Sequence, residues 1–128
     1  MELAVDDPLA RLLGLRFSTP GDGAVDAELD VRPDLLAPNG YLHAGAIITL
    51  ADMACGYGSL TNLPPDAYAF TTIELKSNFL GTARDGAVIC EARLRHGGRT
   101  TQVWDATVRA EERTIALFRC TQLMLYPP

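Results

Sequence analysis

Asp52 is the residue of this chain that is best placed to do chemistry. It is the only fixed charge in a run from Leu42 to Gly56 that otherwise holds mostly small and aliphatic residues. Apolar residues on every side predict a helix buried all round, not an amphipathic surface helix. Because burial disfavours the charged form, a carboxylate there must find hydrogen-bond partners or hold its proton more tightly. We interpret Asp52 as a candidate catalytic group; the alternative is a structural carboxylate satisfied by hydroxyl or backbone donors.

The elements that must position Asp52 are a loop, a long helix and a turn. Residues 32–41 contain two prolines and an Asn-Gly pair, which predict a loop. The helix is predicted from about Ala44 to Leu60, and the Asn-Leu-Pro-Pro-Asp stretch at 62–66 ends it.

Strands are predicted on both sides of this helix. Alternating apolar and polar residues indicate one strand at 25–31 and four more at 69–80, 87–95, 100–110 and 114–126. The turns between the last four are short, which favours antiparallel pairing. Near the start, Asp6, Asp7 and Pro8 begin a short helix that Gly14 ends. The predicted order is a short helix, strands, one long helix and four further strands.

This order predicts an α+β fold, in which a curved antiparallel sheet wraps one long helix. The 128 residues fit a single domain spanning 1–128, without repeats or low-complexity tracts. The edge strands of so small a sheet are exposed, and dimerisation that continues the sheet would cover one of them.

The composition argues against several classes of partner. A net charge of −5 is unfavourable for nucleic acid, which needs a basic face. The three cysteines are far apart and odd in number, and the Asp, His and Cys spacings match no zinc pattern, so we expect neither disulfides nor a metal. The first residues do not resemble a signal peptide, and no uncharged apolar stretch reaches the roughly 18 residues that span a bilayer. We therefore expect no membrane partner and a cytoplasmic location.

Two blocks of residues resemble a known family. The six residues 40–45, Gly-Tyr-Leu-His-Ala-Gly, followed by Leu50 to Asp52, resemble the signature of hotdog-fold acyl-CoA thioesterases of the PaaI-like, phenylacetate-pathway type. Residues 73–80 and the pair Gly98 and Arg99 resemble later parts of the same family, in the same order. The resemblance extends from about residue 12 to residue 125.

The resemblance implies a hotdog fold, an acyl-CoA substrate, no cofactor, and a homodimer that commonly pairs into a homotetramer. It implies that Asp52 is catalytic and that the backbone amide of Ala44 polarises the thioester carbonyl. The role of the Ala44 amide is physically reasonable, since N–H groups in the first turn of a helix lack helical partners and carry partial positive charge. Small residues at Ala44 and Gly45 let a carbonyl approach the backbone. Whether Asp52 acts as a nucleophile or as a general base stays open.

The same helix cannot supply both groups to one carbonyl. Eight helical residues from Ala44 to Asp52 span roughly 12 Å, whereas both groups must lie roughly 3 Å from the reacting atoms. In the family, the acid comes from one subunit and the helix start from its neighbour. A symmetric pair of antiparallel helices satisfies this requirement.

The loop before the helix holds two further candidates. His43 either caps and packs at the helix start or, as the resemblance implies, orients the loop and the substrate carbonyl. Related enzymes often have Asn or Gln six residues before this histidine, where the chain has Ala37. Asn39, two residues later, is the candidate to replace it.

Substrate-binding candidates lie on three other elements. Gly56 and Ser59 follow Asp52 by one and two helical turns, either lining an acyl pocket or permitting close helix packing. Thr71 and Thr72 can face the site from the next strand, although threonine is also common in strands. Arg99 is the preferred contact for CoA phosphates, with Arg84 and Arg95 as other candidates; solvated surface charges are the alternative for all three.

Two other functions compete with thioester hydrolysis. The same fold serves hydratases and dehydratases of acyl-CoA or acyl-carrier-protein substrates, which place a histidine inside the site. A non-catalytic acyl-CoA-binding protein would keep the pocket and show no turnover. The Leu-His-Ala-Gly order at the helix start fits the thioesterases better.

Overall fold

The structure, a computed structural model, describes residues 7–128. Asp6 and the residues before it, including the segment in which we expect no signal peptide, lie outside the described residues. Asp7 caps the N-terminus of helix α1 (Pro8–Leu13), and its carboxylate accepts hydrogen bonds from the backbone N–H groups of Leu9 and Ala10. It ends at Gly14, which takes the left-handed conformation (φ 71°) that glycine tolerates best. The predicted short helix is therefore confirmed over the described residues.

Over the described residues, six antiparallel strands form one sheet in the order β1-β2-β4-β5-β6-β3. Their bounds are Arg16–Gly21 (β1), Ala24–Asp30 (β2), Ala69–Phe79 (β3), Ala87–Gly97 (β4), Thr101–Ala110 (β5) and Arg113–Leu125 (β6). The five strands that the sequence delimits are confirmed. Strand β1 is the element whose residues the sequence did not delimit. Pro20 interrupts its pattern, and an edge strand accepts proline because one side of its backbone needs no partner.

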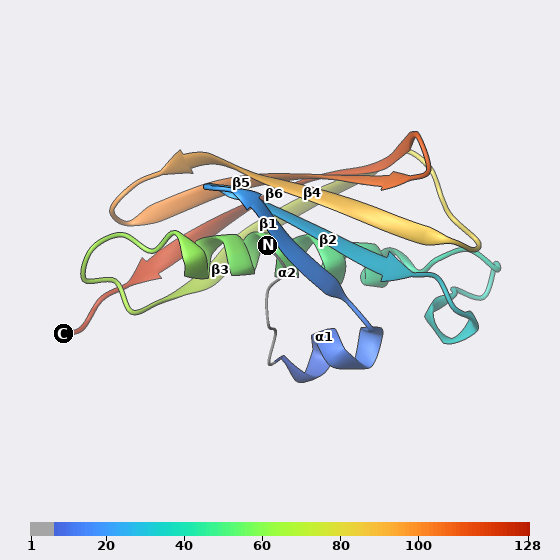
Figure 1. Ribbon diagram of the computed structural model, residues 1–128, viewed down its shortest axis with the longest axis horizontal. Helices are drawn as coiled ribbons and strands as arrows, with labels where there is room; N and C mark the ends of the chain where they lie inside the picture. The colour runs from blue at the N-terminus through green and yellow to red at the C-terminus, as the bar shows by residue number, and fades with distance from the viewer. Residues whose placement is uncertain (1–6) are drawn as a thin grey trace.

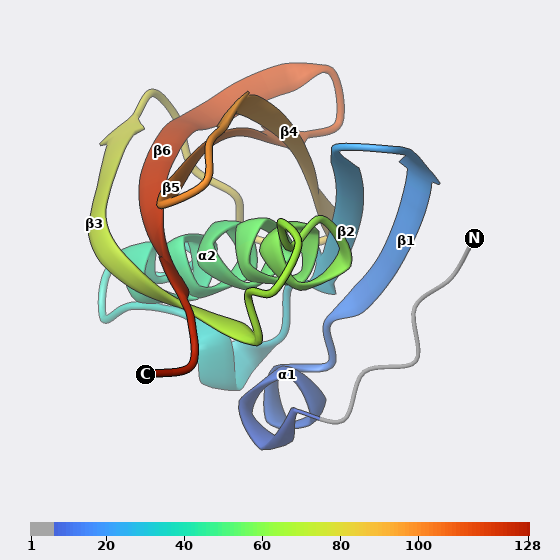
Figure 2. The same ribbon diagram turned by 90° about the vertical axis from the view of Figure 1, so that its left-hand side faces the viewer.

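The sheet curves around helix α2 (Ala44–Thr61), as Figures 1 and 2 show. The absence of a side chain at Gly58 lets α2 pack closely against β5, because a Cβ built there would lie 2.3 Å from Cη2 of Trp104. The helix is buried on its sheet-facing side, but Ile48, Asp52 and Tyr57 on its other side are half-buried. The prediction of a helix buried all round is therefore wrong for the single protomer, since the sheet covers only one side.

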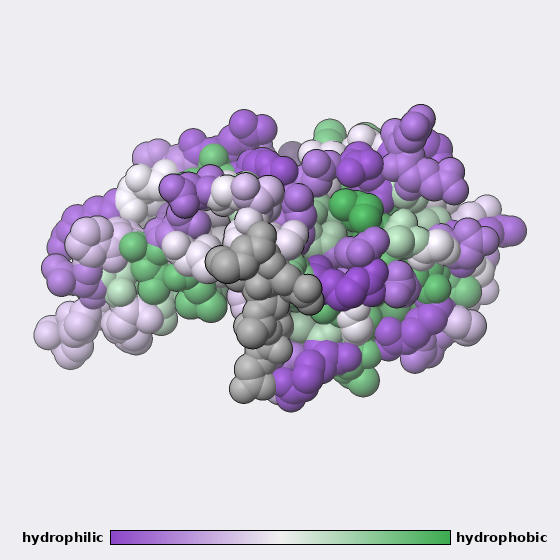
Figure 3. Space-filling view, in the orientation of Figure 1, coloured by the Kyte–Doolittle hydropathy of each residue, from purple (hydrophilic) through white to green (hydrophobic). Residues whose placement is uncertain are grey.

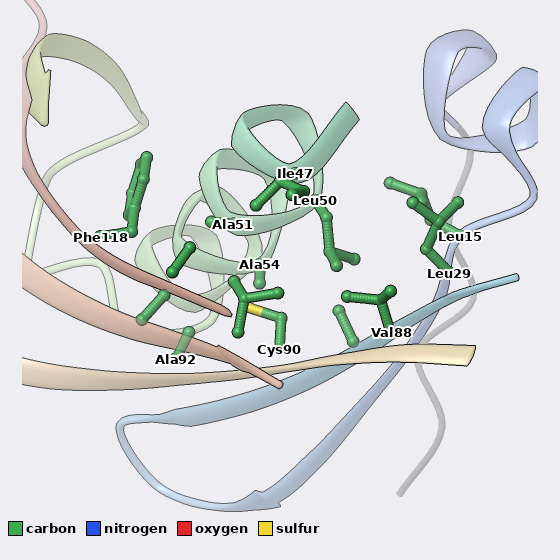
Figure 4. Close-up of a cluster of buried hydrophobic side chains, with 14 of the residues drawn as sticks. Leu15, Leu29, Ile47, Leu50, Ala51, Ala54, Val88, Cys90, Ala92 and Phe118 are labelled. Atoms are coloured by element: carbon green, nitrogen blue, oxygen red, sulfur yellow. The ribbon is translucent and has the colours of Figure 1, made fainter. Parts of the chain in front are cut away.

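The core fills the space between the sheet and α2. Leu50 and Ala54 of the helix lie against Val88 and Cys90 of β4 in this cluster (Figure 4). Inward residues of β4 and β5 alternate with outward ones, as expected for a sheet with one covered face. Cys55, Cys90 and Cys120 are buried and free. This core fixes the position of α2, and with it the position of Asp52.

The outward face of the sheet is polar. It holds ion pairs such as Arg93–Asp26 and Arg119–Asp105, and the surface seen in Figure 3 is largely hydrophilic with separate hydrophobic areas. A small 3-10 helix, η1 (Pro33–Leu35), lies in the predicted loop before α2. Between residues 7 and 128, no helix combines the length and apolar character that crossing a bilayer requires.

Candidate active site

Asp52 lies in the middle of α2 and faces strand β3. The hydroxyl oxygen of Thr72 lies 3.4 Å from its Oδ1 atom, and the same hydroxyl lies 2.6 Å from Oε1 of Gln122 on β6. Burial raises the pKa of Asp52, and the Thr72 hydroxyl partly offsets that rise. The carboxyl group therefore keeps its proton at higher pH than an exposed aspartate does.

A mostly apolar hollow of about 230 Å³ opens beside Asp52. Helix α2, strand β3 and the start of α1 build it. Its lining residues are Asp7, Asp52, Met53, Gly56, Tyr57, Leu60 and Phe70. The carboxylate stands among apolar side chains, which suits an uncharged acyl group next to a reacting carbonyl.

The start of α2 presents one unused hydrogen-bond donor. The Nδ1 atom of His43 accepts a hydrogen bond from the N–H of Gly45 at 3.0 Å. The backbone carbonyl of His43 accepts hydrogen bonds from the N–H groups of Ala46 and Ile47. Within residues 7–128, the N–H of Ala44 has no partner, and Ala44 itself is exposed. An exposed first-turn N–H is a ready donor for an oxyanion.

The helix start lines a different hollow from Asp52. This second hollow, of about 370 Å³, includes His43, Gly45 and Thr49 of α2 together with Leu9 and Leu13 of α1. None of the residues that line it also lines the hollow beside Asp52. One protomer thus carries the acid and the free amide in two separate places.

The loop candidates lie apart from Asp52. Oδ1 of Asn39 accepts a hydrogen bond from the N–H of Tyr41 at 3.1 Å, so it closes its own turn. The backbone of Ala37 pairs with Tyr41 and Gly40 across the same turn. The structure therefore places Asn39, the residue considered as a replacement for Ala37, in a local structural contact.

The candidates on α2 and β3 divide into two groups. Gly56 lines the Asp52 hollow, where a Cβ would lie 3.1 Å from Phe70, and Thr72 contacts Asp52. Ser59 lies on the buried side of α2, and its hydroxyl has no partner among the described residues. Thr71 is exposed, as expected for a strand neighbour of an inward residue.

The three arginines also lie in different surroundings. Arg95 is paired with Asp105, and Arg84 lies over the ring of Tyr41 with 4.5 Å between Cζ and the ring centroid. The guanidinium of Arg99 lies over Tyr126, whose hydroxyl donates to the Arg99 carbonyl. Arg99 is exposed and forms no ion pair with another described residue, which leaves it free to meet a phosphate.

Sequence reasoning missed the apolar wall of the hollow and the glutamine behind Thr72. Met53, Tyr57, Leu60 and Phe70 look like ordinary core residues in the sequence, and no local signal separates them from the core. Gln122 carried a detectable signal, because it is a polar residue in the alternating series of inward positions on β6, which otherwise holds apolar residues.

Comparisons with known proteins identify the family of the chain. Residues 39–117 match the model of the thioesterase superfamily. The chain is 31% identical to the 1,4-dihydroxy-2-naphthoyl-CoA hydrolase of Listeria monocytogenes over 114 residues, which cover 88% of this chain and 92% of that protein.

Solved structures show the same fold. A mutant of a thioesterase enzyme from Staphylococcus aureus is 30% identical, with a TM-score of 0.88 over 94% of this chain and 100% of that chain. The PaaI protein of the Escherichia coli phenylacetic acid degradation operon is 24% identical, with a TM-score of 0.85 over 94% of this chain and 86% of that one. The predicted hotdog fold is confirmed.

Proposed function

Because the chain belongs to the thioesterase superfamily and is a thioester hydrolase, we propose that it cleaves acyl-CoA thioesters at a site that two protomers build together. The observation that carries this proposal is the separation, in one chain, of a half-buried carboxylate at Asp52 from an unpartnered N–H at Ala44. Both groups are needed at one carbonyl, so a second chain must supply one of them.

In this proposal, the N–H of Ala44 donates to the thioester oxygen while Asp52 of the other protomer activates the attack. As a general base, Asp52 takes a proton from water, the resulting hydroxide adds to the carbonyl carbon, and the tetrahedral oxyanion rests on the Ala44 amide. The carbon–sulfur bond then breaks, and the CoA thiolate receives the proton from Asp52. As a nucleophile, Asp52 itself displaces CoA and forms a mixed anhydride that water then cleaves.

The hollow beside Asp52 supports an acyl-binding role. Met53, Leu60 and Phe70 give it apolar walls, and Tyr57 adds an aromatic face. Gly56 keeps it open, because any side chain there would approach Phe70. We propose that the acyl group occupies this hollow and that the CoA phosphates meet exposed arginines such as Arg99 outside it.

Strand β3 is the surface that suits a second protomer. It lies at one edge of the sheet, and within residues 7–128 it pairs only with β6. Leu75 and Phe79 lie opposite the buried Cys120 and Ala116, yet each is more than one-third exposed. A partner β3 strand would satisfy the open backbone edge and cover these side chains. Light scattering would show whether the mass is two or four times that of the 13.8 kDa chain.

A panel of acyl-CoAs, assayed for free thiol release, tests the reaction. We expect release with the wild type and a loss of at least roughly 100-fold in kcat for Asp52→Asn, with the oligomer intact. Addition or loss of water without thiol release would instead select a hydratase or dehydratase, and saturable binding without any reaction would select an acyl-CoA-binding protein. Single turnover in ¹⁸O-water then tests the nucleophilic route, because Asp52 acquires the label only if it forms a mixed anhydride that water opens at the Asp52 carbonyl carbon.

A further inference from the structure

Gln122 is a fully buried side chain for which the proposed reaction assigns no role. It lies on the inward face of β6, directly opposite Thr72 in the register of β3 with β6. Its Oε1 atom is 2.6 Å from the Thr72 hydroxyl, whereas its Nε2 atom is buried and has no partner among the described residues. Buried N–H donors without a partner are rare and costly, so this arrangement calls for a physical explanation.

The Thr72 hydroxyl has one proton and two acceptors within reach. It can donate to Gln122 or to Asp52, but not fully to both. When Asp52 is protonated, its own O–H donates to Thr72, and Thr72 donates to Oε1 of Gln122. The observed orientation of the amide suits this state.

When Asp52 is a carboxylate, the hydrogen bonds between Gln122, Thr72 and Asp52 must run in the opposite direction. A half-turn of the Gln122 amide brings Nε2 to the Thr72 oxygen and requires no new space, because the amide oxygen and nitrogen are nearly the same size. Nε2 then donates to Thr72, and the hydroxyl proton is free to donate to the charged Asp52. The half-turn leaves Oε1 rather than Nε2 without a partner, which is the less costly of the two.

We propose that Gln122 is a positioning residue that acts through Thr72 and directs a hydroxyl proton toward the Asp52 carboxylate, the hydrogen bonds reversing when Asp52 takes up a proton. The inference rests on the proposed function, in which Asp52 changes its protonation state during each turnover. A carboxamide suits this task because it offers a donor at one end and an acceptor at the other.

A neighbouring glutamine shows what a purely structural role looks like. Gln102 lies opposite Gln122 on β5 and is equally buried, but both ends of its amide are used. Its Nε2 donates to the Asn62 carbonyl at 2.7 Å, and its Oε1 accepts from the indole of Trp104 at 2.9 Å. Gln102 therefore provides a matched control for the loss of a buried glutamine.

Other titratable groups also lie near Asp52. Asp7 and Tyr57 line the same hollow, and Cys55 follows Asp52 on the helix. They are unchanged in every variant described below, so differences between variants report on Thr72 and Gln122.

The test compares the pH dependence of kcat/KM for four variants with that of the wild type, using the acyl-CoA that the wild type cleaves fastest. Thr72→Val should lower kcat/KM on the acid side about tenfold, the factor that one hydrogen bond to a charged acceptor supplies, and should move the acid limb to higher pH. Gln122→Met should move it in the same direction by less. The double variant should match Thr72→Val alone, because Gln122 acts only through Thr72. Thr72→Ser, which keeps the hydroxyl, should leave the acid limb at the same pH as in the wild type, whatever its effect on the rate.

Gln102→Met is the control, and it should lower the melting temperature without moving the acid limb. A second readout does not depend on turnover: the ¹³C carboxyl resonance of Asp52, identified by its absence in Asp52→Asn, should titrate at higher pH in Thr72→Val and in Gln122→Met.

Failure of the inference and failure of the proposed function are distinguishable. If Asp52→Asn is inactive but Gln122→Met leaves the Asp52 titration unchanged, or if the effects of Gln122→Met and Thr72→Val simply add, the positioning role is wrong and the hydrolytic site stands. If Asp52→Asn keeps the wild-type rate while the titration shifts as expected, the hydrogen-bond chain stands and the catalytic assignment of Asp52 is wrong.

Discussion

Proline at position 44 would remove the unpartnered N–H at the start of α2 and little else. Ala44 is the first helical residue, a position that proline favours because its N–H has no helical partner. The preceding His43 has φ −62° and ψ 135°, the extended conformation that a following proline requires. We therefore expect Ala44→Pro to fold and assemble as the wild type does.

The expected cost in activity follows from the number of donors removed. Loss of one oxyanion donor costs roughly 100- to 1,000-fold in kcat. Ala44→Gly keeps the N–H and removes only a methyl group from an exposed side chain, so it serves as the matched control and should remain within a few-fold of the wild type. A wild-type kcat for Ala44→Pro would show that this amide does not polarise the substrate.

Mixing two inactive variants then tests whether the site is shared. An Asp52→Asn chain retains the amide, and an Ala44→Pro chain retains the acid. In a heterodimer of the two, one site receives both intact groups and the other receives neither. Equal amounts that exchange at random give half heterodimers, so the mixture should recover about one quarter of the wild-type activity.

The assay is thiol release after the two proteins are unfolded and refolded together, compared with each protein refolded alone. A mixture no more active than its separately refolded components would refute the shared site, provided that differently tagged chains are shown to co-purify. Recovery of about one quarter of the wild-type activity would show that the acid and the amide of each site come from different chains.

Three further predictions follow from single residues. Because burial raises the pKa of Asp52, kcat/KM should fall as the pH decreases through that raised pKa. Asp52→Asn should melt at a higher temperature than the wild type at neutral pH, since the buried charge destabilises the fold once the pH exceeds the pKa of an ordinary aspartate. Calorimetry at pH 4 and pH 7 should show this gain in melting temperature only at the higher pH. Leu75→Lys should place a charge in the contact proposed for β3, giving monomers by light scattering and no turnover. Gly58→Ala should force a methyl group into Trp104 and lower the free energy of unfolding by about 1–3 kcal/mol in urea, whereas Gly21→Ala, which meets nothing within 4 Å, should change it little.

Local patterns in the sequence were sufficient for most of the elements. Alternation of apolar and polar residues predicted five strands, and the long apolar run with Asp52 predicted α2 within one residue of its observed end. Strand β1 was not delimited, because it is short and contains proline, and an edge strand tolerates residues that a central strand does not. The helix is exposed on one side where complete burial was predicted, because composition does not tell how far a sheet wraps.

The sequence by itself determined which residues are inward or outward along five of the six described strands, where α1 and α2 begin and end, and that Asp52 is an unusual charge. These properties depend on neighbours a few residues apart, so they are visible in a one-dimensional pattern. The tertiary structure alone decided that β3 pairs with β6 across the edge of the sheet, which brings Thr72 and Gln122 together beneath Asp52 although they are 50 residues apart in the chain. It also decided that Asp52 lines one hollow, whereas His43 and Gly45, the two neighbours of Ala44 in the chain, line another. Pairing between distant strands depends on how the whole chain closes around its core, and no local spacing specifies it.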